Sequence, residues 1–125
     1  MEYMSRSLRM AEKARDSSCI TAGKNYELTR SEKGIKFINS NNGQCWEFFV
    51  EDGQLKINKS GTAYNLTSDD LEVKAFKISI SGDDNTSNEQ PKVTFYLDVQ
   101  AKKGVLFRTP SIKIQTTISQ RNLNL

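Results

Sequence analysis

Apolar side chains recur at every second position over much of the chain from residue 25 onward, and this period of two constrains the fold most strongly. Residues 93–99 alternate apolar and polar side chains without interruption, and residues 112–116 repeat the pattern. Such alternation places one face of a strand on a core and the other in water, as in antiparallel sheets. The sequence therefore predicts a meander of about six antiparallel strands.

Clusters of turn-forming residues separate the strand-like runs. Asp52 and Gly53 lie between two β-rich segments, and this dipeptide is a strong signal for a tight hairpin. Within residues 71–81, we expect Val73 and Ala75 to share one face of the strand. The pattern predicts strands over residues 35–39, 45–50, 55–58, 63–66, 71–81 and 91–99, and from residue 112 onward.

A different period marks the N-terminal segment. Over residues 2–16, apolar side chains at Met4, Leu8 and Ala11 form one stripe with helical spacing. Two serines at positions 17 and 18 end this pattern. The segment is therefore predicted to be an amphipathic helix.

The helix and the strands together predict one α+β domain. A chain of 125 residues suits a single domain over residues 1–125. In this domain, residues 1–18 are the helix and residues 24–125 the β-rich region, so an N-terminal amphipathic helix packs on an antiparallel β-sheet meander. No N-cap residue precedes the first turn, and we expect the natural helix to continue upstream of Met1.

A single sheet covers only one side of a helix, so part of the apolar stripe should stay available. We expect the sheet to cover the stripe near Leu8 and Ala11, while its upper part near Met4 meets neighbouring molecules. Met4, Leu8 and Ala11 are therefore the predicted assembly face of the helix.

Two cysteines, Cys19 and Cys45, lie far apart in the sequence without a Cys-x-x-Cys motif. They are either two buried free thiols or one disulfide formed in an oxidising compartment. Turn-forming residues lie beside each cysteine and favour the disulfide, whose closed loop would contribute about 3 kcal/mol to stability. Such a bond favours an extracytoplasmic location, and the adjoining aromatics should pack in the core around it: Trp46, Phe48 and Phe49.

The chain contains no histidine. Histidine is the usual general base and the commonest metal-binding nitrogen, so most hydrolase mechanisms and mixed Cys/His zinc sites are excluded. An enzyme that uses carboxylates alone is the remaining alternative, for instance Glu47 or Glu72 with Asp98. Glycoside chemistry needs such carboxylates at a set separation in a cleft, and nothing in the sequence brings these together. We therefore predict no enzyme, no catalytic residue, no metal ligand and no cofactor.

Two sets of residues, a polar run and a row of basic side chains, have both a functional and a structural interpretation. The polar run over residues 81–90 contains oxygen donors that suit calcium, but it lacks the spacing of a calcium loop, and a solvated loop is the simpler interpretation. Basic residues at Arg6, Arg9, Lys13 and Arg15 alternate with acidic ones along the predicted helix. We interpret them as a solvated face and expect no nucleic-acid partner.

Short motifs along the chain resemble those of bacterial prepilin-like proteins. Residues 114–122, with the sequence Ile-Gln-Thr-Thr-Ile-Ser-Gln-Arg-Asn, resemble the closing strand of these proteins. The helix followed by Cys19 resembles the exposed half of the pilin helix, and further segments agree in order over residues 46–55, 66–73 and 90–94. The resemblance is to the minor pilins and pseudopilins of type IV pilus and type II secretion machines, the J-type pseudopilins in particular.

The resemblance implies a structural subunit of a filament. Its partners would be other pilin-like subunits, and an apolar half-helix preceding Met1 would anchor it in the inner membrane before assembly. The family has no catalytic residues to carry over. The alternative is an independent extracellular binding or adhesion module with the same α+β layout.

Overall fold

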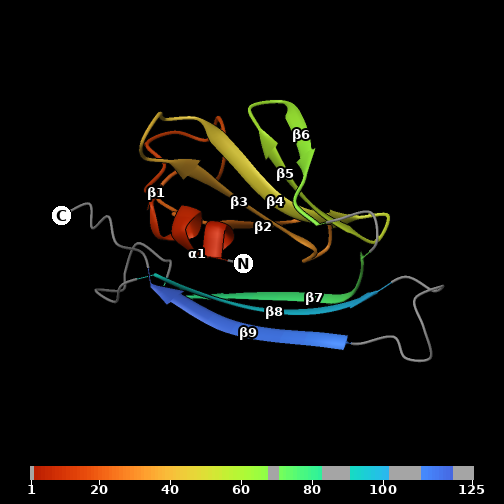
Figure 1. Ribbon diagram of the computed structural model, residues 1–125. Helices are drawn as coiled ribbons and strands as arrows, with labels where there is room; N and C mark the ends of the chain where they lie inside the picture. Colours follow the sequence, from red (N-terminus) through yellow and green to blue (C-terminus); the bar gives the residue numbers. More distant parts are fainter. Residues whose placement is uncertain (1, 68–70, 83–90, 102–110, 120–125) are drawn as a thin grey trace.

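The computed structural model describes residues 2–67, 71–82, 91–101 and 111–119. Within these residues, two antiparallel sheets face each other (Figure 1). The larger sheet has the strand order β1-β3-β4-β5-β6, with β2 also paired to β3, and the smaller sheet has the order β7-β8-β9. The elements are α1 (Glu2–Arg9), β1 (Ala11–Glu12), β2 (Glu27–Thr29), β3 (Gly34–Asn39), β4 (Cys45–Glu51), β5 (Gln54–Lys59), β6 (Thr62–Asn65), β7 (Leu71–Ser81), β8 (Lys92–Ala101) and β9 (Ser111–Ser119).

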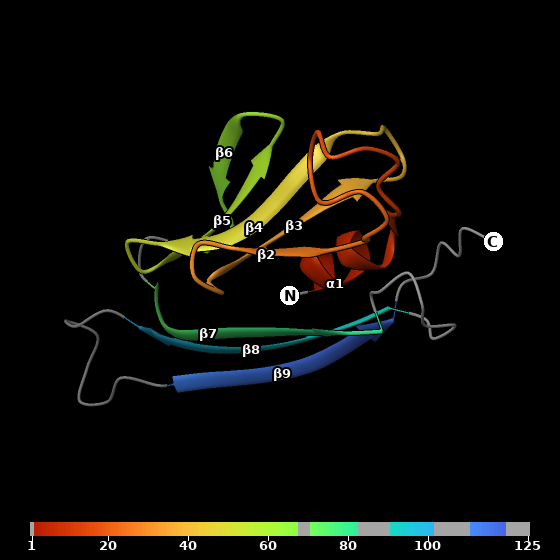
Figure 2. The ribbon, with the colours of Figure 1, turned by 180° about the vertical axis from the view of Figure 1, so that it is seen from behind.

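The helix α1 lies between the two sheets at one end of the domain, as both views show (Figures 1 and 2). It contacts β3 of the larger sheet and β9 of the smaller one. The predicted α+β fold, with a helix packed on a single sheet, is therefore wrong, and the described chain is a β-rich two-sheet domain with one short helix. No helix in the described part of the chain combines the length and hydrophobicity that a membrane span requires.

The helix is shorter than predicted because the chain after Arg9 joins a sheet. Ala11 pairs with Asn39 and Glu12 with Ile38, which makes residues 11–12 an edge strand beside β3. Pairing at the sheet edge satisfies the backbone N–H and C=O groups that a longer helix would have satisfied internally. Burial of the Ala11 side chain stabilises this arrangement further. Tertiary packing thus overrides the local helix propensity of the segment.

The disulfide between Cys19 and Cys45 is formed, with a Cα–Cα distance of 5.7 Å, which confirms that prediction. It ties the segment that follows β1 to the start of β4. The turn before Cys19 is held by Ser18, which donates to the Asp16 carboxylate from its backbone N–H at 3.0 Å and its hydroxyl at 2.6 Å. These hydrogen bonds, that of the hydroxyl first, lower the pKa of Asp16.

The hairpins follow the turn chemistry of the sequence. Asp52 and Gly53 have φ angles of 54° and 73°, the left-handed values that a two-residue hairpin turn requires. Strands β4 and β5 pair directly across this turn, as predicted. The prediction that Val73 and Ala75 share one face of the strand is wrong. An irregularity between these two residues shifts β7 by one residue against β8. Val73 is therefore buried, whereas Ala75 is only partly buried.

The core fills the space between the sheets and includes the helix. On β8, the strict alternation predicted for residues 93–99 is confirmed, since all four apolar side chains of this run are buried. On the larger sheet, the Phe37 and Phe48 rings stack with centroids 5.8 Å apart, and Phe37 meets Trp46 edge-on at 6.2 Å. Aromatic pairs of this kind stabilise a core by about 1 kcal/mol each beyond the area they bury.

Removing the disulfide tests how far it stabilises the fold. We expect the double substitution Cys19→Ser and Cys45→Ser to lower the free energy of unfolding by about 2–5 kcal/mol, the usual effect for a small domain. Chemical denaturation measures this change, and the reduced wild-type domain serves as the matched control. A denaturation midpoint equal to that of the oxidised wild type would contradict the expectation.

Candidate functional site

An open apolar groove lies where the start of α1 meets the β5–β6 hairpin. Its volume is about 350 Å³, and its lining consists of Tyr3, Ile57, Lys59, Tyr64 and Leu66. Three of these are the exposed large hydrophobic side chains of the described residues, with exposed fractions of 41% for Tyr3, 51% for Tyr64 and 37% for Leu66. Exposed apolar side chains that gather in one place mark interaction surfaces more often than scattered ones do.

Alternation along the hairpin places these side chains on one face. Ile57 and Lys59 lie two residues apart on β5, and Tyr64 lies directly opposite Ile57 on β6. The turn between the strands uses Ser60 and Gly61 with φ angles of 54° and 101°. Buried Ile57 forms the floor of the groove, and Tyr64 forms an exposed wall.

Lys59 provides the single charge in the groove lining. Its ammonium group lies 4.7 Å from the centre of the Trp46 ring, 5.5 Å from that of Tyr3 and 5.9 Å from that of Tyr64. Among the described residues, no carboxylate is paired with it. The groove therefore combines apolar walls with one cation stabilised by aromatic faces.

The predicted assembly residues do not line this groove. Met4 and Leu8 are 1% and 0% exposed and belong to the core between the sheets, and Ala11 is a buried residue of β1 rather than of a helix. The expectation that the stripe stays open is corrected, because two sheets rather than one enclose the helix. At this end of the domain, Tyr3 is the apolar residue of α1 that reaches the surface.

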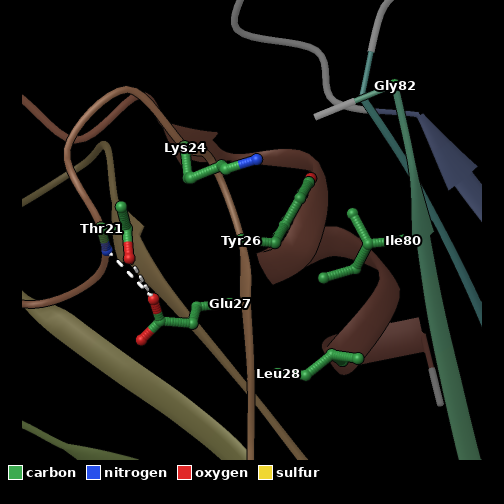
Figure 3. A pocket seen from close by; sticks show the side chains of 7 residues that line it. All are labelled: Thr21, Lys24, Tyr26, Glu27, Leu28, Ile80 and Gly82. Atoms are coloured by element: carbon green, nitrogen blue, oxygen red, sulfur yellow. Dashed lines mark hydrogen bonds between the residues drawn. The ribbon is translucent and has the colours of Figure 1, made fainter. Parts of the chain in front are cut away.

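A second pocket of about 360 Å³ lies between the segment before β2 and the end of β7 (Figure 3). Polar groups of its lining form hydrogen bonds within the domain. Thr21 donates to the Glu27 carboxylate from its backbone N–H and its hydroxyl, at 3.2 and 2.7 Å. The Tyr26 hydroxyl donates to the backbone carbonyl of Leu8 at 2.6 Å.

The carboxylates considered for catalysis are not brought together in a shared cleft. Glu47 lies on the larger sheet, where it accepts hydrogen bonds from Thr29 and Arg30. Glu72 lies on the smaller sheet and forms an ion pair with Lys74 at 3.1 Å. Asp98 lies on β8, opposite Lys113 of β9. Glu47 therefore lies on a different sheet from the other two carboxylates.

Other candidate residues have structural positions or lie outside the described residues. Trp46, Phe48 and Phe49 are buried, which confirms their predicted place in the core. In the described ranges, no group of three or more acidic or cysteine side chains is arranged to hold a metal ion. Of the candidate calcium run over residues 81–90, residues 83–90 lie outside those ranges.

Comparisons of the chain with protein-family models, with curated proteins and with solved structures found no match. A function must therefore be inferred from the residues and their geometry. The groove was not predicted from the sequence, because its lining comes from α1, β5 and β6. One signal was present: Lys59 occupies the next inward position after Leu55 and Ile57, where the alternation calls for an apolar residue.

Charge substitutions at two adjacent helix residues test which of them is buried. We expect Met4→Glu to lower the free energy of unfolding by more than about 3 kcal/mol, because it puts an unpaired charge in the core. Tyr3→Glu is the matched control. It should lower the free energy of unfolding by only about 1 kcal/mol, which is the scale of the edge-on contact between Tyr3 and Phe48. Thermal and chemical denaturation provide the measurement. Equal losses in the two variants would contradict the described burial of the helix.

Proposed function

We propose that the chain is a structural subunit of a pilin-like filament, a minor pilin or a pseudopilin, and that the groove contacts a neighbouring pilin-like subunit. One observation carries the proposal. The exposed large apolar side chains of the described residues gather around the start of α1 and the β5–β6 hairpin. A subunit that works by lateral contact needs such a surface, whereas an enzyme needs convergent reactive groups.

The chemistry of the groove favours a particular kind of occupant. Ile57, Tyr64 and Leu66 present apolar surface, and Lys59 adds a cation that no described carboxylate neutralises. Charge complementarity then selects a segment whose apolar side chains flank one carboxylate. We propose that a neighbouring subunit supplies this segment, and that pairing with Lys59 fixes its position in the groove.

Two further features support a filament subunit outside the cytoplasm. The motifs over residues 46–55, 90–94 and 114–122 resemble those of minor pilins and pseudopilins. The disulfide between Cys19 and Cys45 fits an oxidising compartment, such as the periplasm or the cell surface. In this proposal, an apolar half-helix precedes Met1 in the natural protein and anchors it in the inner membrane before assembly.

Site-specific cross-linking in cells tests the proposal. With a photoreactive amino acid in place of Tyr3 in the natural full-length protein, we expect a cross-link to a protein that mass spectrometry identifies as pilin-like. The same amino acid in place of Tyr96 is the matched control, because Tyr96 is a partly exposed aromatic residue of the smaller sheet. It should give no such adduct.

Two outcomes would count against the filament role. A cross-link from position 3 to a receptor or polysaccharide-associated protein would favour an independent extracellular binding module instead. Equal cross-linking from positions 3 and 96 would show that the groove is not the contact surface.

A further inference from the structure

Strand β6 forms one outer edge of the larger sheet, and all four of its residues are exposed. In both views the β5–β6 hairpin projects away from the smaller sheet (Figures 1 and 2). Proteins usually protect such edges with lysine, proline or a covering segment. The edges of the smaller sheet follow this rule with exposed Lys74 and Lys77 on β7 and Lys113 on β9, whereas the Thr-Ala-Tyr-Asn sequence of β6 has no charge and no proline.

The register of the hairpin determines which backbone groups of β6 face outward. Leu66 donates its N–H to the carbonyl of Leu55 at 2.8 Å, in continuation of the β5–β6 ladder. Hydrogen-bonded and non-hydrogen-bonded pairs alternate along an antiparallel ladder, so Tyr64 also directs its backbone groups toward β5. Ala63 and Asn65 then direct their N–H and C=O groups to the free edge, where no described strand pairs with them.

We propose that β6 pairs antiparallel with β6 of a second copy of the chain, about a two-fold axis at Tyr64. In this register, Ala63 of each copy faces Asn65 of the other, and both are the residues whose backbone groups point outward. Each of the two pairs can therefore exchange two hydrogen bonds.

The same register covers the exposed apolar side chains of the hairpin. Tyr64 lies opposite Tyr64 of the second copy in a non-hydrogen-bonded pair, where Cα atoms are about 4.5 Å apart and side chains are closest. Leu66 lies opposite Thr62 on the same face. The two aromatic rings and the two leucines, which are exposed in the single chain, thus lose water contact together.

Charge favours a second copy as the occupant of this edge. A two-fold axis brings identical groups together, so any ionised side chain on the edge would repel its own copy. No ionisable side chain lies between Thr62 and Leu66 except the phenol of Tyr64. On the next strand, Lys56 is paired with Glu51 at 3.4 Å, and Lys59 lies against the Trp46, Tyr3 and Tyr64 rings. The pairing does not depend on a role in a filament and is expected of the purified chain.

Sedimentation equilibrium of the 125-residue chain tests the pairing. We expect the average mass to rise with concentration toward twice the monomer mass. Ala63→Pro removes an outward N–H without removing a bond to β5, so it should stay monomeric. Tyr64→Lys should also stay monomeric because it places like charges opposite each other, whereas the matched control Tyr96→Lys should retain the dimer. Circular dichroism confirms that each variant is folded.

Disulfide trapping tests the register separately. Tyr64→Cys should form a covalent dimer under mild oxidation, because position 64 faces itself across the axis, while Thr62→Cys should not. Three results would overturn the proposal. They are a chain that remains monomeric at millimolar concentration, a dimer whose mass Ala63→Pro and Tyr64→Lys leave unchanged, and equal trapping at positions 62 and 64.

Discussion

The burial of Met4 and Leu8 between the two sheets is the packing interaction on which the rest of the structure depends. A three-stranded sheet cannot cover a six-stranded one alone, and α1 fills one end of the space between them (Figure 1). Because the helix ends after two turns, its last carbonyls lack helical partners, and the Tyr26 hydroxyl satisfies that of Leu8. After the helix, the chain returns to the larger sheet. It does so through the edge strand β1, the disulfide at Cys19 and the segment that leads to β2.

The enclosed helix also determines where the domain can meet a partner. With Met4 and Leu8 inside, Tyr3 is left at the surface beside the β5–β6 hairpin, and the groove forms between them. Lys59 lies over the Tyr3, Trp46 and Tyr64 rings, where the aromatic faces compensate for its partial loss of water. Both proposals, a groove that receives a neighbouring segment and a strand edge that pairs with its own copy, use this one end of the domain.

Local features of the sequence were enough to predict the seven strands β3 to β9, whereas β1 and β2 of the described residues were not predicted. The alternation over residues 93–99 and the Asp52-Gly53 turn act through neighbouring residues, and the structure confirms both. The end of the helix was not predictable in this way, since it depends on Ala11 pairing with Asn39, which lies far along the chain. The division into two sheets likewise depends on which distant strands pair. The groove was not predicted for the same reason, because Tyr3 and Tyr64 come together only in the folded chain.

The central claim is that α1 lies inside the domain, so that only its outer end, at Tyr3, comes to the surface beside the β5–β6 hairpin among the apolar residues of this helix. NMR spectroscopy with a soluble paramagnetic agent measures this directly, because the agent broadens only the signals of groups that it can approach. We expect strong broadening of the Tyr3 and Tyr64 ring signals and little change in the methyl signals of Met4 and Leu8. Broadening of the Met4 and Leu8 methyls as strong as that of the Tyr64 ring would place the helix on the outside of a sheet and contradict the account.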